Sequence, residues 1–329
     1  MLCHHDLVVA RAQPSPLAVR LESLRGPLTG YCYRILGAAS EVEDAVQETM
    51  LRAFRALERY DPDRAAFSTW VHKIATNVCL DMVRGARRRA LPWDMGPASA
   101  SQDIGIPLAP EHWVEPLADS RLAATEDPAL LVLRHETLRL AFIAALQWLP
   151  PRQRVVLVLR DVLEFRAGEA AEVMEVSVAA ANSALQRARA TLAEHRPSPA
   201  DRPDVAQRDL LRRYVDAFHN HDVPALLAVL ADDARTGMPP FPWWLDSSDR
   251  IAAAMTSTDA CADDRLVPGE FANGCWTLGQ YRPDATGTLR PFALLVLVCR
   301  GGRISETVTY LGYGDRFEEF GLPEIPGDR

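Results

Sequence analysis

The sequence predicts a multidomain protein in which two all-α helical domains are followed by an α+β domain. Apolar residues recur at helical spacing through residues 17–92 and 131–196. A stretch rich in proline, serine and acidic residues, 93–130, lacks this periodicity and separates the two blocks. Residues 204–329 begin with helical patterns and end in strand-like runs, an order typical of an α+β domain.

Composition and charge argue against a membrane-spanning or secreted protein and locate the segments that could contact nucleic acid. The 329 residues are 48% hydrophobic and 24% charged, with no apolar run of about 18 residues that would indicate a membrane span. The N-terminus lacks the features of a secretory signal, so we expect a cytoplasmic protein. The net charge of −8 is uneven: residues 1–92 and 131–200 carry +3 and +2, whereas 93–130 and 201–329 carry −6 and −7. Only the two basic blocks suit contact with phosphate.

The six cysteines are scattered and form no CxxC pair. This favours reduced, buried thiols and predicts neither a metal site nor a cofactor. Cys3, His4 and His5 are adjacent, but a frayed terminus is the simpler interpretation.

The first block predicts four helices. Residues 17–36 form a helix pair interrupted by Gly26-Pro27. Ser40 is a candidate N-cap, with Glu43 completing a capping box. The helix over 41–58 has a polar face and an apolar core face, the latter consisting of Val42, Val46, Met50, Ala53, Phe54 and Leu57.

A turn, Asp61-Pro62-Asp63, precedes a helix over residues 67–89. One arc of this helix is apolar. The other combines an exposed indole, an amide and several cations, the combination that binds phosphates and unstacked bases. A solvated helix face remains the alternative. The candidate residues are Trp70, Lys73, Asn77, Asp81, Arg84 and Arg88.

The second block predicts helices over 133–149, 152–163, 169–174 and 178–195, the last with Ser177 as N-cap. The final two have the spacing of a helix-turn-helix, whose second helix enters the major groove of DNA. Polar side chains on the exposed face of that helix can reach base edges. These are Asn182, Ser183, Gln186, Arg187 and Arg189.

Two stretches resemble a known family. DAVQETMLRAFRAL with YDPDRAAFSTW resembles region 2 of the sigma-70 family, extracytoplasmic-function (ECF) type. LPPRQRVVLVLRDVL with SVAAANSALQRARATL resembles region 4. The resemblance implies a sigma factor that performs no chemistry, with core RNA polymerase (the β′ clamp helices and the β flap) and promoter DNA as partners. The helix over 67–89 would capture the −10 element and the last helix the −35 element. The clamp helices would contact Asp44, Gln47, Glu48 and Arg52.

The chain departs from the family pattern at the turn before the last helix. Glu175-Val176 stands where a small residue or glycine is usual, and Glu164 and Arg166 also replace small residues. An added acid near DNA would weaken promoter contact. Residues 93–130 are predicted to be a flexible acidic linker, which in the family threads polymerase channels. A nucleic-acid mimic and a passive tether both remain open for it.

The third block predicts helices over 205–221, 223–231 and 247–255, followed by a curved antiparallel sheet. The sheet strands are expected at 265–271, 275–281, 291–299 and 303–311, with Gly301-Gly302 as a hairpin. The phrases ANGCWTLGQYRP and GGRISETVTYLG resemble SnoaL-like members of the NTF2 cone fold. The resemblance implies a pocket for a small-molecule ligand, lined by Met238, Trp243, Trp244, Trp276, Tyr281 and Tyr310.

Acid–base catalysis in that pocket would need Asp216, His219, His221 or Asp246, and no spacing forces two of them together. A ligand-sensing or intramolecular regulatory domain is therefore favoured over an enzyme. Two alternatives remain for the whole chain. One is a DNA-binding regulator that acts without polymerase, which would have no need of the helix over 41–58. The other is a SnoaL-like isomerase or cyclase fused to a DNA-binding module.

Overall fold

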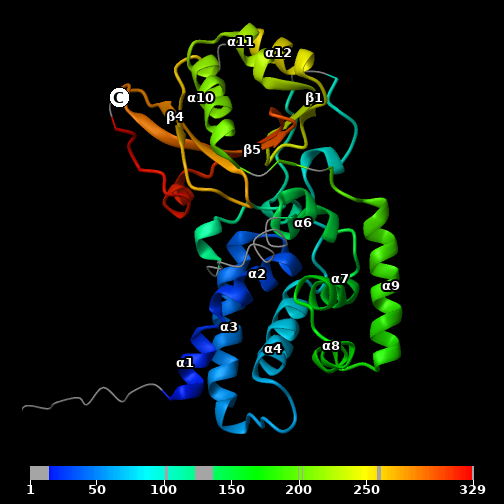
Figure 1. Ribbon diagram of the computed structural model, residues 1–329. Coiled ribbons are helices and arrows are strands. Elements are labelled where there is room, and N and C mark those ends of the chain that lie inside the picture. The colour runs from blue at the N-terminus through cyan, green and yellow to red at the C-terminus, as the bar shows by residue number, and fades with distance from the viewer. Residues whose placement is uncertain are drawn as a thin grey trace, which may run out of the picture.

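The computed structural model describes residues 15–100, 103–122, 136–198, 200–201, 203–257 and 261–327. The helices of the first two blocks lie together at one end of the molecule, and a six-stranded sheet with three covering helices lies at the other (Figure 1). Among the described residues, no helix combines the length and apolar character needed to cross a membrane. The predicted order of two helical domains and an α+β domain is confirmed.

The first helical domain has its helices close to where the periodicity predicts them. The break between the first two lies at residues 23–24, and Gly26-Pro27 falls inside the first turn of the second helix. Proline is tolerated there because a first-turn N–H has no intrahelical partner. The elements are α1 (Pro16–Glu22), α2 (Arg25–Leu36), α3 (Ala39–Ala56), η1 (Leu57–Arg59) and α4 (Phe67–Met82).

Helix α4 is shorter than predicted. It ends at Met82, and Gly85 adopts a positive φ of 77° that turns the chain away from the helix axis. The prediction that Arg84 and Arg88 lie on this helix is therefore wrong. The arginines favour helix by propensity, but the glycine among them provides the turn.

The second helical domain contains α6 (Leu140–Leu146), α7 (Pro151–Leu157), the π-helical η5 (Val158–Val162), α8 (Ala167–Met174) and α9 (Val178–Glu194). Residues 133–135 of the first predicted helix lie outside the described residues. The side chain of Ser177 accepts a hydrogen bond from the Ala180 N–H at 3.1 Å, which confirms the predicted N-cap. Glu175 lies in the left-handed region with φ 55°, which explains why glycine is common at this turn.

The C-terminal domain places α10 (Val205–His219), α11 (Val223–Val229) and α12 (Ser248–Thr256) over one sheet (Figure 1). The sheet order is β2-β1-β6-β5-β4-β3. Its strands are β1 (Leu230–Gly237), β2 (Trp244–Leu245), β3 (Arg265–Pro268), β4 (Trp276–Pro283), β5 (Leu289–Arg300) and β6 (Arg303–Leu311).

The sheet is mixed, because β1 pairs in parallel with β6, and this corrects the prediction of an antiparallel sheet. Strand β1 was missed because its residues carry acids and little alternation. The predicted hairpin is confirmed: Gly301 and Gly302 both have positive φ, and β5 and β6 pair antiparallel on either side.

The two faces of the sheet pack on different partners. Along β5, Leu295 and Leu297 face the helices α10–α12, whereas Leu294 and Val296 belong to the core shared with the helical domains. Tyr310 on β6 lies in the same shared core, with its hydroxyl donating to the Val114 carbonyl at 3.0 Å. The C-terminal domain therefore shares a hydrophobic core with both helical domains.

A short part of the predicted linker is buried. Trp113, Val114 and Leu117 are all buried, and Ala90 pairs with Trp113 in a parallel bridge. Three short turns shape the segment: η2 (Pro92–Asp94), η3 (Pro110–His112) and η4 (Asp119–Arg121). The prediction of a flexible linker is wrong for residues 113–118, because the run WVEPLA buries its side chains among the packed domains.

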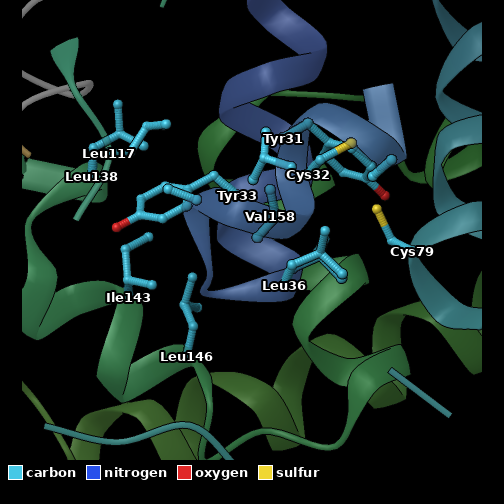
Figure 2. Packing of buried hydrophobic residues seen from close by; sticks show 14 of the residues in the cluster. Tyr31, Cys32, Tyr33, Leu36, Cys79, Leu117, Leu138, Ile143, Leu146 and Val158 are labelled. Atoms are coloured by element: carbon cyan, nitrogen blue, oxygen red, sulfur yellow. The ribbon is translucent and has the colours of Figure 1, made fainter. Parts of the chain in front are cut away.

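One side chain joins all three domains and this segment. The Asn273 amide donates to the Tyr33 hydroxyl at 2.8 Å and to the Leu138 carbonyl at 2.5 Å. Its oxygen accepts from the Leu117 N–H at 2.9 Å. Figure 2 shows the Tyr33 ring reaching from α2 towards Leu117 and Leu138. Asn273 is 1% exposed and has a φ of 55°.

Candidate functional site

The first candidate surface is α4. Trp70 is half-buried against Tyr60 and Phe67, with ring centroids 5.3 and 5.6 Å away. The indole that was predicted to be exposed is therefore only partly exposed. The three rings form an aromatic cluster at the start of α4, which leaves part of one indole open to solvent. Such a surface can stack on an unpaired base.

The polar residues farther along α4 divide into two groups. Asn77 and Asp81 are exposed, and Asp81 accepts a hydrogen bond from the Arg84 guanidinium at 2.8 Å. Arg84 itself lies just past the helix end, with its side chain 80% exposed. Lys73 instead forms an ion pair at 2.8 Å with Glu175 of the second helical domain. The Lys73 ammonium lowers the pKa of the Glu175 carboxyl.

The arginine run after α4 is largely engaged within the protein. The Arg88 guanidinium lies 3.5 Å from the centroid of the Trp148 ring, and burial lowers its pKa. Arg89 is 6% exposed and pairs with Glu41 at 2.5 Å. Arg87 is exposed. In this arrangement Arg88 therefore holds the two helical domains together through Trp148 and is not presented to a DNA phosphate.

The second candidate surface is the outer face of α9. All five predicted residues on this helix are exposed, and α9 runs along the outside of the molecule (Figure 1). Arg189 donates two hydrogen bonds to Asp161, at 2.9 and 2.7 Å, which raise its pKa. Asn182, Ser183, Gln186 and Arg187 form a polar patch near the N-terminal half of the helix. This is the half that a helix-turn-helix inserts into the major groove.

The third candidate surface is α3. Asp44, Gln47 and Arg52 are exposed, and Arg52 donates to Glu48 at 2.6 Å, the predicted i,i+4 pair. Phe54 was predicted to be a core residue and is 61% exposed, so that prediction is wrong.

Leu51 also reaches the surface of α3, where it is 43% exposed. Sequence reasoning missed it, although its position on the polar arc of the helix was a signal. Exposed apolar residues among polar ones mark protein interfaces. Leu51 and Phe54 give α3 an apolar component in addition to its charges.

The six residues predicted to line a pocket in the C-terminal domain do not share one environment. Tyr281 and Tyr310 belong to the core shared with the helical domains, whereas Trp243 and Trp276 pack against the core beneath α10–α12. Tyr310 faces Val114, and the Tyr281 hydroxyl donates to the Pro323 carbonyl at 2.6 Å. The Trp244 indole N–H donates to Gly96, and that of Trp276 to Gln207, at 3.0 and 3.1 Å. Met238 and Trp243 are half-buried elsewhere. Apolar side chains of α10–α12 pack on the face of the sheet that carries Leu295 and Leu297.

The predicted acid–base candidates of this domain are also separate. Nε2 of His219 accepts the Leu266 N–H at 2.8 Å, and burial lowers the pKa of this histidine. Asp216 pairs with Arg212, and Asp246 pairs with Arg250. His221, predicted to lie at the end of the helix, lies two residues past the end of α10 and has a positive φ of 50°.

Among the described residues, no three His, Cys, Asp or Glu side chains are grouped as a metal site requires. Cys3, His4 and His5 lie outside the described residues. The other five cysteines form no disulfide with one another. Cys32 and Cys79 lie in the core of the first helical domain (Figure 2).

Comparison with known proteins matches two family models. Residues 21–89 match Sigma-70 region 2, and residues 139–192 match Sigma-70, region 4. The chain is 40% identical to the ECF RNA polymerase sigma factor SigG of Mycobacterium tuberculosis, over 92% of this chain and 83% of the relative.

Two solved structures align with this chain. The crystal structure of the M. tuberculosis ECF sigma factor SigJ aligns with 93% of this chain and 99% of its own, with a TM-score of 0.59 and 21% identity. An NTF2-like protein from Cytophaga hutchinsonii aligns with 35% of this chain and 97% of its own, with a TM-score of 0.27 and 18% identity.

Proposed function

Because the chain belongs to the ECF sigma factors of the sigma-70 family, we propose that it directs core RNA polymerase to −35 and −10 promoter elements, with its SnoaL-like domain modulating this activity. Sigma factors bind core RNA polymerase and promoter DNA. The protein carries no chemistry of its own in this proposal and works in the cytoplasm. The observation that carries it is 40% identity to a sigma factor over 92% of the chain, helical domains and tail together.

The proposal divides the chain by function. Residues 17–92 bind polymerase and the −10 element, residues 131–196 bind the −35 element and the β flap, and residues 204–329 regulate. The segment 93–130 connects the helical domains. The matched ranges 21–89 and 139–192 lie inside the first two divisions and support them.

Each surface receives a role from its chemistry. The polar patch on α9 reads the −35 element, because short amides and arginine reach base edges in the major groove. The aromatic cluster at the start of α4, with Asn77, Asp81 and Arg84, receives the unstacked strand of the −10 element. The exposed face of α3, with Leu51 and Phe54, docks on the β′ clamp helices.

Run-off transcription with purified core polymerase tests the proposal. The protein is expected to support initiation from specific sites on double-stranded DNA that core polymerase alone does not use. A protein that binds promoter DNA but never co-purifies with core polymerase, even at low salt, would instead favour a regulator that acts without polymerase.

Replacing Trp70 by alanine is expected to slow open-complex formation about tenfold, because stacking on one base contributes roughly 1–3 kcal/mol. Affinity for core polymerase should change by less than about twofold, since Trp70 lies on α4 and not on the docking face of α3. Permanganate footprinting measures the first quantity and fluorescence anisotropy the second. Trp70→Phe keeps an aromatic ring in the cluster and serves as the control. An equal loss of both quantities would contradict the stacking role.

The contact between the two helical domains supports a regulatory role for the C-terminal domain. The −35 and −10 elements lie about 25 base pairs apart, roughly 85 Å along B-DNA at 3.4 Å per base pair. The two helical domains contact each other here through the Lys73–Glu175 ion pair and the Arg88–Trp148 stack. They must separate to reach both elements. Asn273 of the C-terminal domain bonds to both of them and so opposes separation.

Removing residues 200–329 is therefore expected to increase promoter-dependent transcription several-fold, because it removes the contacts that hold the helical domains together. Run-off transcription with the full-length and shortened chains measures the change. Circular dichroism of the shortened chain is the control for retained helix. Unchanged transcription would contradict a regulatory tail, and reduced transcription by a folded shortened chain would contradict a tail that opposes separation.

A further inference from the structure

The N-terminus of α3 has no cap of its own. The helix begins at Ala39, and the N-cap residue Ala38 has no side-chain acceptor for the first-turn N–H groups. Ser40, the predicted N-cap, is instead the second residue of the helix. Free N–H groups at a buried helix start must find an acceptor elsewhere in the protein. One carboxylate oxygen of Glu115 accepts the Ser40 N–H at 2.8 Å, so the cap comes from 75 residues away.

Main-chain bonds hold Glu115 in place. Its N–H donates to the Gly37 carbonyl at 3.0 Å, and its carbonyl accepts from the Tyr33 hydroxyl at 2.7 Å. Gly37 forms the turn between α2 and α3 with a φ of 76°, a conformation that suits glycine. Glu115 is 7% exposed. Hydrogen bonds of the N–H and the carbonyl of Glu115 thus hold its carboxylate at the start of α3.

The C-terminal domain reaches the same carboxylate. The Arg316 guanidinium lies 3.3 Å from the Glu115 oxygen that caps α3, and it also donates to Glu319 at 2.8 Å. The Glu319 carboxylate lies 3.6 Å from Arg121, which bonds to Glu43 in the first turns of α3 at 3.1 Å. Two chains of charged groups therefore connect the C-terminal domain to the first turns of α3, one through Glu115 and one through Arg121.

We propose that Glu115 is a positioning residue for polymerase binding: it fixes the start of α3, and Arg316 of the C-terminal domain contacts the same carboxylate. The proposal rests on the proposed role of α3 in docking on core polymerase. A carboxylate suits the task, because it accepts the first-turn N–H groups and its charge opposes the positive end of the helix dipole. The docking residue Asp44 lies little more than one turn from the cap.

The test compares full-length variants by hydrogen exchange and by polymerase binding. Glu115→Ala is expected to increase exchange at residues 39–43 about tenfold and to weaken core-polymerase affinity about three- to tenfold, the range that loss of a cap produces. Glu115→Gln keeps an acceptor oxygen and should retain most of the protection, and it replaces the alanine variant if that chain does not fold. Arg316→Gln should increase exchange at residues 39–43 less than Glu115→Ala does.

The matched control is Glu111→Ala, which removes an exposed acid from the same segment. It should leave exchange and affinity unchanged. Unchanged exchange at residues 39–43 in Glu115→Ala would overturn the capping role. Faster exchange with wild-type affinity would overturn the positioning role and leave the sigma function intact. A wild-type protein that does not bind core polymerase would overturn the proposed function and this inference with it.

Discussion

Replacing Asn273 by alanine is expected to lower the free energy of unfolding by about 3 kcal/mol, through unpaired buried groups and a strained backbone. The change removes the side-chain bonds to Tyr33, Leu138 and Leu117, all of which are buried. It also places an alanine at a φ of 55°, which a residue with a Cβ adopts at a cost. Urea unfolding followed by tryptophan fluorescence measures the loss.

Asn273→Gly separates the two causes. Glycine adopts a positive φ without strain but forms none of the side-chain bonds, so it should be about 1 kcal/mol less destabilising than alanine. The control is Asn77→Ala, which removes an exposed asparagine of α4 and should change stability by less than about 0.5 kcal/mol. If Asn273→Ala were no more destabilising than this control, the junction would not stabilise the assembly of domains.

Replacing Arg154 by alanine is expected to lower the free energy of unfolding by a similar amount, about 3 kcal/mol. Arg154 is 5% exposed and donates to the Ile35 carbonyl of the first helical domain. It also donates to the Gln147 side chain at 2.6 Å and to the Leu149 carbonyl at 3.1 Å. Burial lowers its pKa to about 10, so the guanidinium stays protonated at neutral pH.

The acceptors around Arg154 explain how a buried cation is tolerated although no carboxylate of the described residues forms an ion pair with it. Ile35 lies at the C-terminal end of α2, and Gln147 and Leu149 follow the end of α6. Helix C-termini carry partial negative charge and carbonyls without helical partners. The guanidinium donates to carbonyl groups at the C-terminal ends of α2 and α6 and so joins the two helical domains.

Arg154→Met tests whether packing or charge matters more at this site. Methionine fills much of the same space, and apolar replacements of buried charges are often tolerated, so its cost should stay below about 1.5 kcal/mol. Arg152→Ala, an exposed change on the same helix, is the control. Equal losses for methionine and alanine would show that the hydrogen bonds to the helix ends, and not packing, stabilise this junction.

Local patterns predicted most of the helices. Helical periodicity located α3 and α9 within two residues at each end, and the Ser177 cap is formed as predicted. The paired glycines 301 and 302 located the hairpin between β5 and β6. These features depend on residues within a few positions of one another. The exposed polar patch on α9 was predictable for the same reason, since its face follows from the buried stripe of that helix.

The failures share a different origin. Phe54 belongs to an apolar stripe that predicts burial, but no element of the described chain covers it. Arg88 belongs to a basic run that predicts phosphate contact, but Trp148 of the other helical domain lies against it. The predicted pocket required Tyr310 and Trp276 to face one cavity, and Tyr310 faces Val114 instead. Each outcome depends on which surfaces pack together.

The sequence by itself determined the family, the order of the domains and the faces of the individual helices, because propensity, periodicity and caps act between near neighbours. Only the tertiary structure decided that residues 113–118 are buried, that the candidate DNA surfaces are partly engaged with each other, and that Glu115 caps α3. These contacts join residues tens to hundreds of positions apart. They form because burying apolar surface such as Trp113 and Leu117 brings them together, and no local pattern encodes which surfaces will meet.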